Sequence, residues 1–393
     1  MKSVLILTAS VGEGHNKAAY SLEDTFRRNG YNVTTVDFIK KTSKLLNLCI
    51  VGGYKSMVFK YPKLYGGLYR ITNVDDPCYR VSKCIKAMFE TGVTNIINET
   101  RPDIIIGTHA FAALIVSNLK GENKINVPFI SVITDFQAHY AYINNNVDAY
   151  IVGSRYTKQD MIRKGVAPSK IFTYGIPIRR DFFDTSFIDK NFDKKCFTIL
   201  VMGGGLGAGR IDKVLKNIMS NKHNLKIIVI CGNNSALRRY LIRRYDNKNE
   251  GKVIDILGYV NEISRVMTEA DIIISKPGGL TVSEAVAKKL PMIIPFSIPG
   301  QEEENARFLT ASGVAIELSN LSKLNSIVDE LISSPQILCS MRKNMEQLVL
   351  KNSSKDIVLL ANELIGRKIG EFTNNRKVNH MTFNKVTGNI TLL

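Results

Sequence analysis

One stretch in the second half of the chain carries the side chains whose types and spacing most clearly define a chemistry. Ile272–Ile274 and Met292–Pro295 are short apolar runs, typical of strands that are buried on both faces. Pro277-Gly278-Gly279 ends the first run, and we expect a helix capped by Thr281 or Ser283 to follow it. The stretch is therefore predicted to form one βαβ unit.

The groups that this unit would present suit a nucleotide sugar. Unpaired backbone N–H groups and a positive dipole end at the helix N-terminus, beside Gly278 and Gly279, suit a phosphate. Glu284, expected in the first turn of the helix, can accept hydrogen bonds from two neighbouring sugar hydroxyls. Further polar side chains follow the second strand at the same edge of the sheet: Gln301, Glu302 and Asn305.

Composition restricts the class of protein. The 393 residues are enough for two domains, and 45% hydrophobic with 22% charged residues is ordinary for a globular chain. The net charge of +18 favours a polyanionic partner, either nucleic acid or an anionic membrane surface. The six cysteines include no C-x-x-C pair and no metal-ligand spacing is present, so we expect reduced thiols, no metal site and no cofactor.

Hydropathy predicts a soluble or peripheral protein. A strand is expected within three residues of Met1, so we expect no signal peptide. The most apolar segment, Ile104–Leu119, contains polar residues and is too short to span a bilayer.

A glycine-rich turn with Gly12, Gly14 and His15 follows the first predicted strand, and we expect a helix from near residue 16. Two-glycine turns also occur in dinucleotide-binding proteins, and Asp37 ends the next strand, where a dehydrogenase would hold a ribose. An NAD-dependent oxidoreductase and a purely structural role of the glycines therefore stay open.

Residues 40–90 interrupt the alternation of strands and helices. Ten basic residues lie between Lys40 and Lys86, interleaved with tyrosines, and such a mixture suits an interfacial membrane segment. A nucleic-acid surface and a solvated helical insertion are the alternatives. The residues expected at the acceptor or membrane are Lys55, Lys60, Lys63, Tyr61 and Tyr65 of this segment, together with Gly12, Gly14 and His109.

The remaining pattern predicts an α/β protein with two doubly wound, Rossmann-like domains. We expect a first domain over residues 1–180, a linker at 181–196, a second domain over 197–366 and a basic tail at 367–393. Ligands bind beyond the carboxyl ends of the strands in such sheets, where His15, His109, Asp135 and His139 fall. A flexible turn in the second domain contains Gly203, Gly204, Gly205 and Gly207.

These motifs, in this order, resemble the monogalactosyldiacylglycerol synthase and processive diacylglycerol glucosyltransferase branch of glycosyltransferase family 28. The matching motifs are Gly12-Glu-Gly-His15-x-x-Ala18-Ala19, Val132-Ile-Thr-Asp135-Phe, Tyr174-Gly-Ile-Pro-Ile178, Lys276-Pro-Gly-Gly279-x-Thr281-x-x-Glu284 and Pro299-Gly-Gln-Glu302-x-x-Asn305. The resemblance implies the GT-B architecture, in which the two domains face each other. It departs at Thr108-His109-Ala110-Phe111, where plastid galactosyltransferases commonly have His-Pro, so glucose is favoured over galactose.

The resemblance also implies the ligands. The donor would be a UDP-hexose, with Gly203–Gly207 and Gly278-Gly279 at the pyrophosphate and Glu284 at the ribose. Lys276, Pro277 and Thr281 of the same motif are also expected to contact the donor. Tyr259 and Val260 would hold uracil through their backbone, and the sugar would contact Gln301, Glu302 and Asn305. The acceptor would be diacylglycerol at the cytoplasmic face of the cell membrane, with no nucleic-acid partner.

An inverting transfer is expected, with His15 as the base and Asp135 as the second choice, either as base or as the residue that orients His15. Helix dipole and backbone N–H groups would stabilise the departing UDP. A transferase that uses UDP-N-acetylglucosamine and a polyprenyl-diphosphate-linked acceptor is the alternative closest to this reading, because it has a similar glycine–histidine turn.

Overall fold

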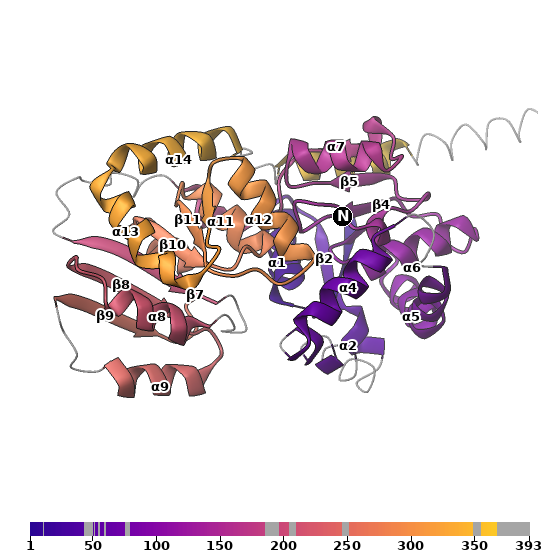
Figure 1. The fold of residues 1–393 in the computed structure, drawn as a ribbon. Coiled ribbons are helices and arrows are strands. Elements are labelled where there is room, and N and C mark those ends of the chain that lie inside the picture. Colours follow the sequence, from indigo (N-terminus) through magenta and orange to yellow (C-terminus); the bar gives the residue numbers. More distant parts are fainter. Residues whose placement is uncertain are drawn as a thin grey trace, which may run out of the picture.

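The computed structural model describes residues 1–10, 12–42, 50, 52–53, 56–58, 60–74, 79–184, 196–203, 210–245, 251–348 and 355–367. The chain forms two α/β domains, each built on a parallel six-stranded sheet (Figure 1). Apolar strands account for this arrangement, because a parallel sheet that is covered by helices on both faces buries nearly every strand side chain.

The sheet of the first domain has the order β2-β1-β3-β4-β5-β6. Its strands are β1 (Ser3–Thr8), β2 (Asn32–Asp37), β3 (Ile104–Gly107), β4 (Phe129–Val132), β5 (Ala149–Ile151) and β6 (Ile171–Phe172). Its helices are α1 (Glu13–Arg28), α2 (Phe38–Thr42), α4 (Pro62–Thr72), α5 (Tyr79–Thr100), α6 (Ala110–Gly121) and α7 (Arg155–Arg163). Short 3-10 helices occur at Tyr140–Tyr142, Pro168–Lys170 and Arg180–Phe183.

The sheet of the second domain has the order β12-β11-β10-β7-β8-β9. Its strands are β7 (Phe197–Met202), β8 (Leu225–Ile230), β9 (Lys252–Leu257), β10 (Ile272–Ser275), β11 (Met292–Ile294) and β12 (Ala315–Glu317). Its helices are α8 (Ile211–Met219), α9 (Ser235–Tyr245), α10 (Ile263–Glu269), α11 (Gly279–Ala287), α12 (Gln301–Ala311), α13 (Leu324–Ser333) and α14 (Pro335–Leu348), with a 3-10 helix at Leu321–Lys323.

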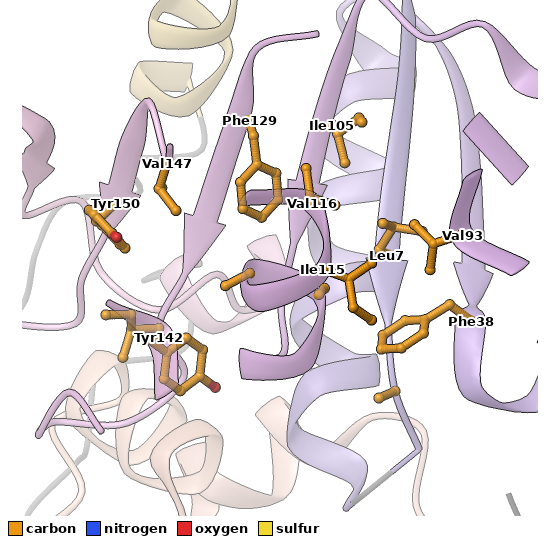
Figure 2. Packing of buried hydrophobic residues seen from close by; sticks show 14 of the residues in the cluster. Leu7, Phe38, Val93, Ile105, Ile115, Val116, Phe129, Tyr142, Val147 and Tyr150 are labelled. Atoms are coloured by element: carbon orange, nitrogen blue, oxygen red, sulfur yellow. The ribbon is translucent and has the colours of Figure 1, made fainter. Parts of the chain in front are cut away.

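A hydrophobic core lies between the first sheet and the helices on one of its faces (Figure 2). Leu7, Ile105 and Phe129 project from three neighbouring strands and are fully buried. They pack in one cluster with Val116 of α6 and Val93 of α5. Close packing of this kind holds the strand ends in fixed positions, which a site at the edge of the sheet requires.

The last described helix, residues 355–367, returns to the first domain (Figure 1). Ile357 and Ala361 belong to a buried cluster with Val4 and Phe26, and the Tyr31 hydroxyl donates to Asn362 Oδ1 at 2.6 Å. The structure differs here from the predicted boundary of the second domain at residue 366. None of the described helices is long and apolar enough to cross a membrane.

The two domains touch where α11 approaches the end of β4. An added Cβ at Gly279 would lie 1.9 Å from the Thr134 carbonyl oxygen, so only glycine permits this approach. Beside it, Phe136 of the first domain stacks on Phe308 of α12 with ring centroids 4.8 Å apart. Leu280 and Ala18 belong to the same buried cluster, which therefore spans both domains.

The contact at Gly279 predicts different effects for two adjacent substitutions. Gly279→Ala should lower the free energy of unfolding by about 1–3 kcal/mol, because the methyl group forces the domains apart. Gly278→Ala is the matched control, because an added Cβ there meets nothing within 4 Å. Urea unfolding of both variants measures the difference. Equal stabilities would show that the backbones of the two domains do not meet at Thr134.

Candidate active site

The first turn of α1 brings His15 to the domain interface. Gly12 is the N-cap of the helix and has a φ of 99°. Because glycine has no side chain, this cap gives the first N–H groups of α1 no side-chain partner. An added Cβ at Gly14 would lie 3.4 Å from Leu280 of α11, so the turn faces the second domain. The helix begins at Glu13 rather than near residue 16.

His15 is held with one ring nitrogen towards the protein. Its Nδ1 donates to the Thr108 carbonyl oxygen at 2.7 Å, and Thr134 Oγ1 lies 3.1 Å from the same nitrogen. Nε2 therefore carries the lone pair. Burial lowers the pKa of His15 to about 4, and the hydrogen bond to Thr108 opposes that shift. The imidazole is neutral at physiological pH and can accept a proton at Nε2.

His109 is a structural neighbour of this group. Its Nδ1 accepts from the Phe111 backbone N–H at 3.1 Å and so caps α6. Its ring lies edge-on to His15, with centroids 4.6 Å apart. Burial and the nearby His15 lower the pKa of His109 well below its usual value. The predicted place of His109 beside the site is consistent with this contact.

Asp135 lies at the contact between the domains. Burial raises the pKa of its carboxyl to about 6, while hydrogen bonds from Gln301 and Asn305 lower it. Asn305 is fully buried, and its Nδ2 donates to Asp135 Oδ1 at 3.3 Å and to the Pro277 carbonyl at 3.0 Å. Its Oδ1 accepts from the Phe136 N–H at 3.0 Å. Asp135 is therefore engaged with the second domain, and the Thr108 carbonyl orients His15.

Glu302 is engaged in holding its own turn. One carboxylate oxygen pairs with Lys276 Nζ, and the other accepts from the Ile298 N–H at 3.1 Å. Both residues were predicted to contact the donor, and the ion pair fixes the position of α12 relative to the end of β10. Gln301 is the first residue of α12 and reaches Asp135.

The N-terminus of α11 has no side-chain cap. The N-cap residue is Gly278, not Thr281 or Ser283 as predicted, and Ser283 Oγ donates instead to the Gly279 carbonyl at 2.8 Å. Glu284 lies in the second turn of the helix and not in the first turn as predicted, because the helix begins at Gly279. The uncapped N–H groups after Pro277 remain suited to an anion.

Glu284 is buried, with 4% of its surface exposed. Burial raises the pKa of its carboxyl, and the charges of Lys17 and then Arg179 lower it. Within the described part of the chain, no residue donates a hydrogen bond to this carboxylate. Its acceptor oxygens are thus available to the hydroxyl groups of a ligand.

Other predicted donor residues fall at neighbouring strand ends. Tyr259 follows β9 and is 59% exposed, and Val260 packs partly buried against the cluster that spans the domains. Gly203 is buried at the end of β7. Gly204, Gly205 and Gly207 lie outside the described residues, so their predicted role at the pyrophosphate stays a prediction.

The basic insertion supplies α4, a helix with an exposed apolar stripe. Tyr61, Leu64, Leu68 and Ile71 are 60%, 58%, 43% and 66% exposed. Lys60 and Lys63 are exposed beside the stripe, Tyr65 is partly buried, and Lys55 lies outside the described residues. This combination of exposed leucine, isoleucine, tyrosine and lysine is typical of a helix that lies on a membrane.

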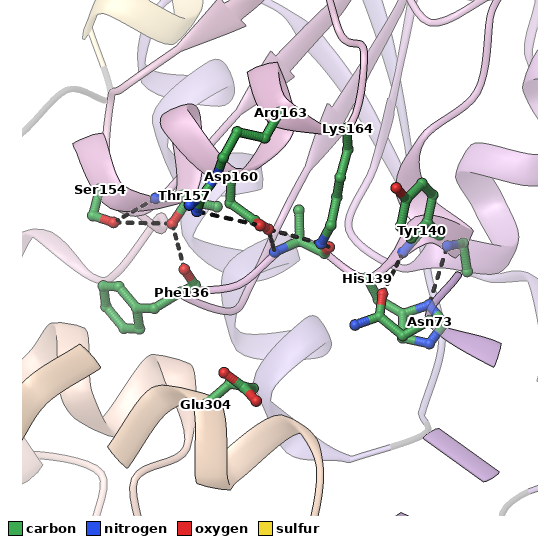
Figure 3. Close-up of polar contacts among 12 residues, drawn as sticks. Asn73, Phe136, His139, Tyr140, Ser154, Thr157, Asp160, Arg163, Lys164 and Glu304 are labelled. Carbon is green, nitrogen blue, oxygen red and sulfur yellow. Dashed lines mark hydrogen bonds and ion pairs between the residues drawn. The ribbon is translucent and has the colours of Figure 1, made fainter. Parts of the chain in front are cut away.

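His139 joins α4 to the segment that follows β4 (Figure 3). Its Nδ1 accepts from the Ala141 N–H at 3.1 Å, and its Nε2 lies 3.3 Å from the Tyr69 carbonyl. Asn73 Oδ1 accepts from the Tyr140 N–H at 3.0 Å. His139, predicted as one of four titratable groups at the sheet edge, is therefore a structural residue that positions α4.

Three residues near the site were missed from sequence. Lys17 lies one turn after Gly14 on the same face of α1, and this spacing could have placed it at the interface. Gly66 and Tyr69 contact a turn of the second domain, and nothing local in the sequence indicates that contact.

The structure argues against an NAD-dependent oxidoreductase, because Asp37, the residue expected to bind the ribose, is engaged within the protein. Asp37 accepts from the Lys40 N–H at 3.1 Å and from Ser10 Oγ, so its carboxylate is used to join the first turn to α2. No cluster of three or more His, Cys, Asp and Glu side chains fit for a metal was found among the residues with described positions.

Two facing doubly wound domains, with the uncapped end of α11 at their contact, define the GT-B class of fold. The structure of MurG from Acinetobacter baumannii is similar, with a TM-score of 0.64 and 16% identity over 92% of this chain and 100% of that one. A UDP complex of MnaA from S. aureus gives a TM-score of 0.58 at 11% identity, over 91% and 95% of the two chains. The predicted fold class is confirmed.

Sequence comparison specifies the family. Residues 15–178 match the monogalactosyldiacylglycerol (MGDG) synthase model, and residues 198–358 match the glycosyltransferase family 28 C-terminal domain. Processive diacylglycerol beta-glucosyltransferases of Bacillus licheniformis and Bacillus subtilis are 30% and 31% identical, over 91% of this chain and 94% of each relative. The chain belongs to this family of glycosyltransferases, as the resemblance predicted.

The pKa values of the two candidate bases predict different pH profiles. With His15 as the base, kcat/KM should stay nearly constant from pH 7 to pH 5, because burial lowers the pKa of His15 to about 4 and it remains deprotonated there. A fall in kcat/KM that begins near pH 6 would instead assign the base to Asp135, whose pKa is about 6. Initial rates at limiting substrate across this range, with a stability control at each pH, measure the profile.

Proposed function

We propose that the protein is an inverting hexosyltransferase that transfers a hexose, with glucose favoured, from a UDP-sugar to diacylglycerol at an anionic membrane surface. The observation that carries the proposal is the domain contact that places the first turn of α1, which contains His15, against α11, which has an uncapped end and the buried Glu284. The relatives are processive diacylglycerol beta-glucosyltransferases, and this supports the choice of acceptor and sugar.

The donor would lie along the carboxyl ends of the second sheet. In this proposal, Glu284 accepts hydrogen bonds from both ribose hydroxyls, and its burial strengthens these bonds. The N–H groups at the start of α11 receive the diphosphate, and the positive end of the helix stabilises the charge that develops on it. The sugar then faces the turn that begins α12, where Gln301 lies.

The reaction needs a base because the diacylglycerol hydroxyl is a poor nucleophile. His15 Nε2 takes the hydroxyl proton as the oxygen attacks the anomeric carbon from the side opposite UDP, and the bond from this carbon to the diphosphate breaks. The Thr108 carbonyl keeps the proton on Nδ1 and so keeps Nε2 ready to accept. The configuration inverts, and a β-glycoside with UDP as leaving group results. No cofactor takes part in this scheme.

The acceptor would reach the site from a membrane on which α4 lies. The exposed stripe of Tyr61, Leu64, Leu68 and Ile71 enters the interfacial region, and Lys60 and Lys63 attract anionic headgroups. A net charge of +18 adds a long-range attraction. We assign the basic surface to the membrane, not to nucleic acid, and the location to the cytoplasmic face of the cell membrane.

The direct test is product formation. The protein is incubated with vesicles that contain either diacylglycerol or a polyprenyl-diphosphate-linked acceptor. Labelled UDP-glucose, UDP-galactose or UDP-N-acetylglucosamine is added in turn, and the lipid products are identified. We expect β-glucosyldiacylglycerol. A labelled lipid formed only from UDP-N-acetylglucosamine and a polyprenyl-diphosphate acceptor would refute the proposed function.

Two substitutions should separate donor binding from chemistry. Glu284→Gln keeps the shape of the side chain and removes its charge, so KM for the UDP-sugar should rise about ten- to hundredfold. His15→Gln should instead lower kcat about a hundredfold or more and leave UDP affinity nearly unchanged. Steady-state kinetics and calorimetric titration with UDP measure both. The reverse pattern would contradict the two roles.

The membrane role of α4 predicts a charge effect. Replacing Lys60 and Lys63 with Gln should weaken binding to phosphatidylglycerol vesicles about tenfold at low salt, because each lysine near an anionic surface contributes about 1 kcal/mol. Lys213→Gln with Lys216→Gln on α8 removes the same charge from the second domain and serves as the control. Co-sedimentation measures binding. Equal losses in both variants would show that only the net charge matters.

A further inference from the structure

Helix α4 has a second face that is turned away from the proposed membrane surface. Leu64, Leu68 and Ile71 are exposed on the outer face, whereas Gly66 is buried and Tyr69 is partly buried on the inner face. The inner face does not pack on the first domain alone. It contacts the turn of the second domain that begins α12.

The contact depends on two glycines, one in each domain. An added Cβ at Gly66 would lie 2.5 Å from Pro299 Cβ, so the helix and the turn already touch. Across the same contact, an added Cβ at Gly300 would lie 2.7 Å from the Tyr69 ring, and Gly300 has a φ of 94°. A left-handed glycine thus gives the turn its shape, and an aromatic ring packs directly on it.

An ion pair extends the contact to the first turn of α12. Arg70 Nη2 lies 3.2 Å from Glu303 Oε2, and the same carboxylate oxygen accepts from the Gly300 N–H at 3.0 Å. The Arg70 side chain is largely solvated and that of Glu303 is partly exposed, so the pair directs the contact more than it stabilises it. Glu303 therefore joins α4, the turn and α12.

The turn leads directly to residues at the active site. Gln301 and Asn305 of α12 both hydrogen bond to Asp135, and Glu302 pairs with Lys276 at the end of β10. A displacement of α4 from Pro299 and Gly300 would therefore shift α12 residues at the contact between the two domains, where the donor and acceptor sites meet. The C-terminal end of α4 is held by Asn73 and His139 (Figure 3), so this part of the helix cannot shift without breaking these bonds.

We propose that Gly66 and Tyr69 position the Pro299–Gln301 turn, so that docking of α4 on the membrane and binding of the donor stabilise each other. Tyr69 and Gly66 act through the turn and are positioning residues. The inference rests on the proposed function, because it requires α4 to lie on the membrane. Coupling of two binding events is reciprocal, so vesicles must tighten UDP binding by the same factor by which UDP tightens vesicle binding.

Adjacent glycines of α4 provide a matched test. Gly66→Ala places a methyl group against Pro299, whereas an added Cβ at Gly67 meets nothing within 4 Å. Both changes favour the helical backbone to a similar extent, so they differ in the contact with the turn. We expect Gly66→Ala to raise KM for the UDP-sugar about fivefold or more with vesicle-bound acceptor, and Gly67→Ala to behave as the unchanged protein.

Coupling itself is measured by calorimetric titration of the full chain with UDP, with and without phosphatidylglycerol vesicles that contain diacylglycerol. In the unchanged protein, vesicles should lower the Kd for UDP about fivefold or more, and Gly66→Ala should reduce this factor towards one while the protein still binds vesicles. Circular dichroism and thermal unfolding verify that both variants are folded.

The outcomes separate the two proposals. The positioning role is overturned if vesicles leave the Kd for UDP of the unchanged protein the same, or if they lower it by the same factor in Gly66→Ala and Gly67→Ala. This holds even if glucosyldiacylglycerol is formed. Coupling that is present in the absence of any lipid product supports the positioning role and refutes the proposed transfer. A loss of coupling in Gly66→Ala alone supports the inference.

Discussion

The backbone of Gly279 lies against the carbonyl of Thr134, and the rest of the site depends on this approach. A side chain of any size at position 279 would separate α11 from the end of β4. The approach allows Asn305 to reach Asp135 and allows Phe136 to stack on Phe308. The Thr134 hydroxyl, at the same strand end, lies beside His15. One close contact therefore aligns the candidate base with the uncapped N-terminus of α11.

Polar residues at the site fall into two groups with different physical roles. Glu302, His139 and Asp37 have their hydrogen-bonding atoms engaged by backbone groups or ion pairs, so they hold the scaffold in shape. Among the residues that the structure describes, none hydrogen bonds to Nε2 of His15 or to the carboxylate of Glu284, so both groups are available to a ligand. Residue type does not separate these groups, since a histidine and a glutamate occur in each.

The strands and the residues at their carboxyl ends could be predicted from sequence, because apolar runs and the polar residues that follow them are local signals. Ile272–Ile274 and Asp135 were placed correctly at a buried strand and at a strand end on these signals alone. The starts of α1 and α11 were placed three or more residues too late, because glycines cap both helices and glycine offers no side-chain signal. The contact of Gly66 with Pro299 could not be predicted, since it joins segments that lie far apart in the chain.

The helix at 355–367 makes the first domain discontinuous in sequence. Its buried residues, such as Ile357 and Ala361, complete a cluster that begins with Val4 on the first strand. The chain leaves the first domain after residue 184 and returns to it after the second domain is complete. During synthesis, domains generally fold as units from the N-terminus. Here the apolar cluster around Val4 stays uncovered until the helix at 355–367 has left the ribosome. The second domain can therefore reach its native packing before the first one does.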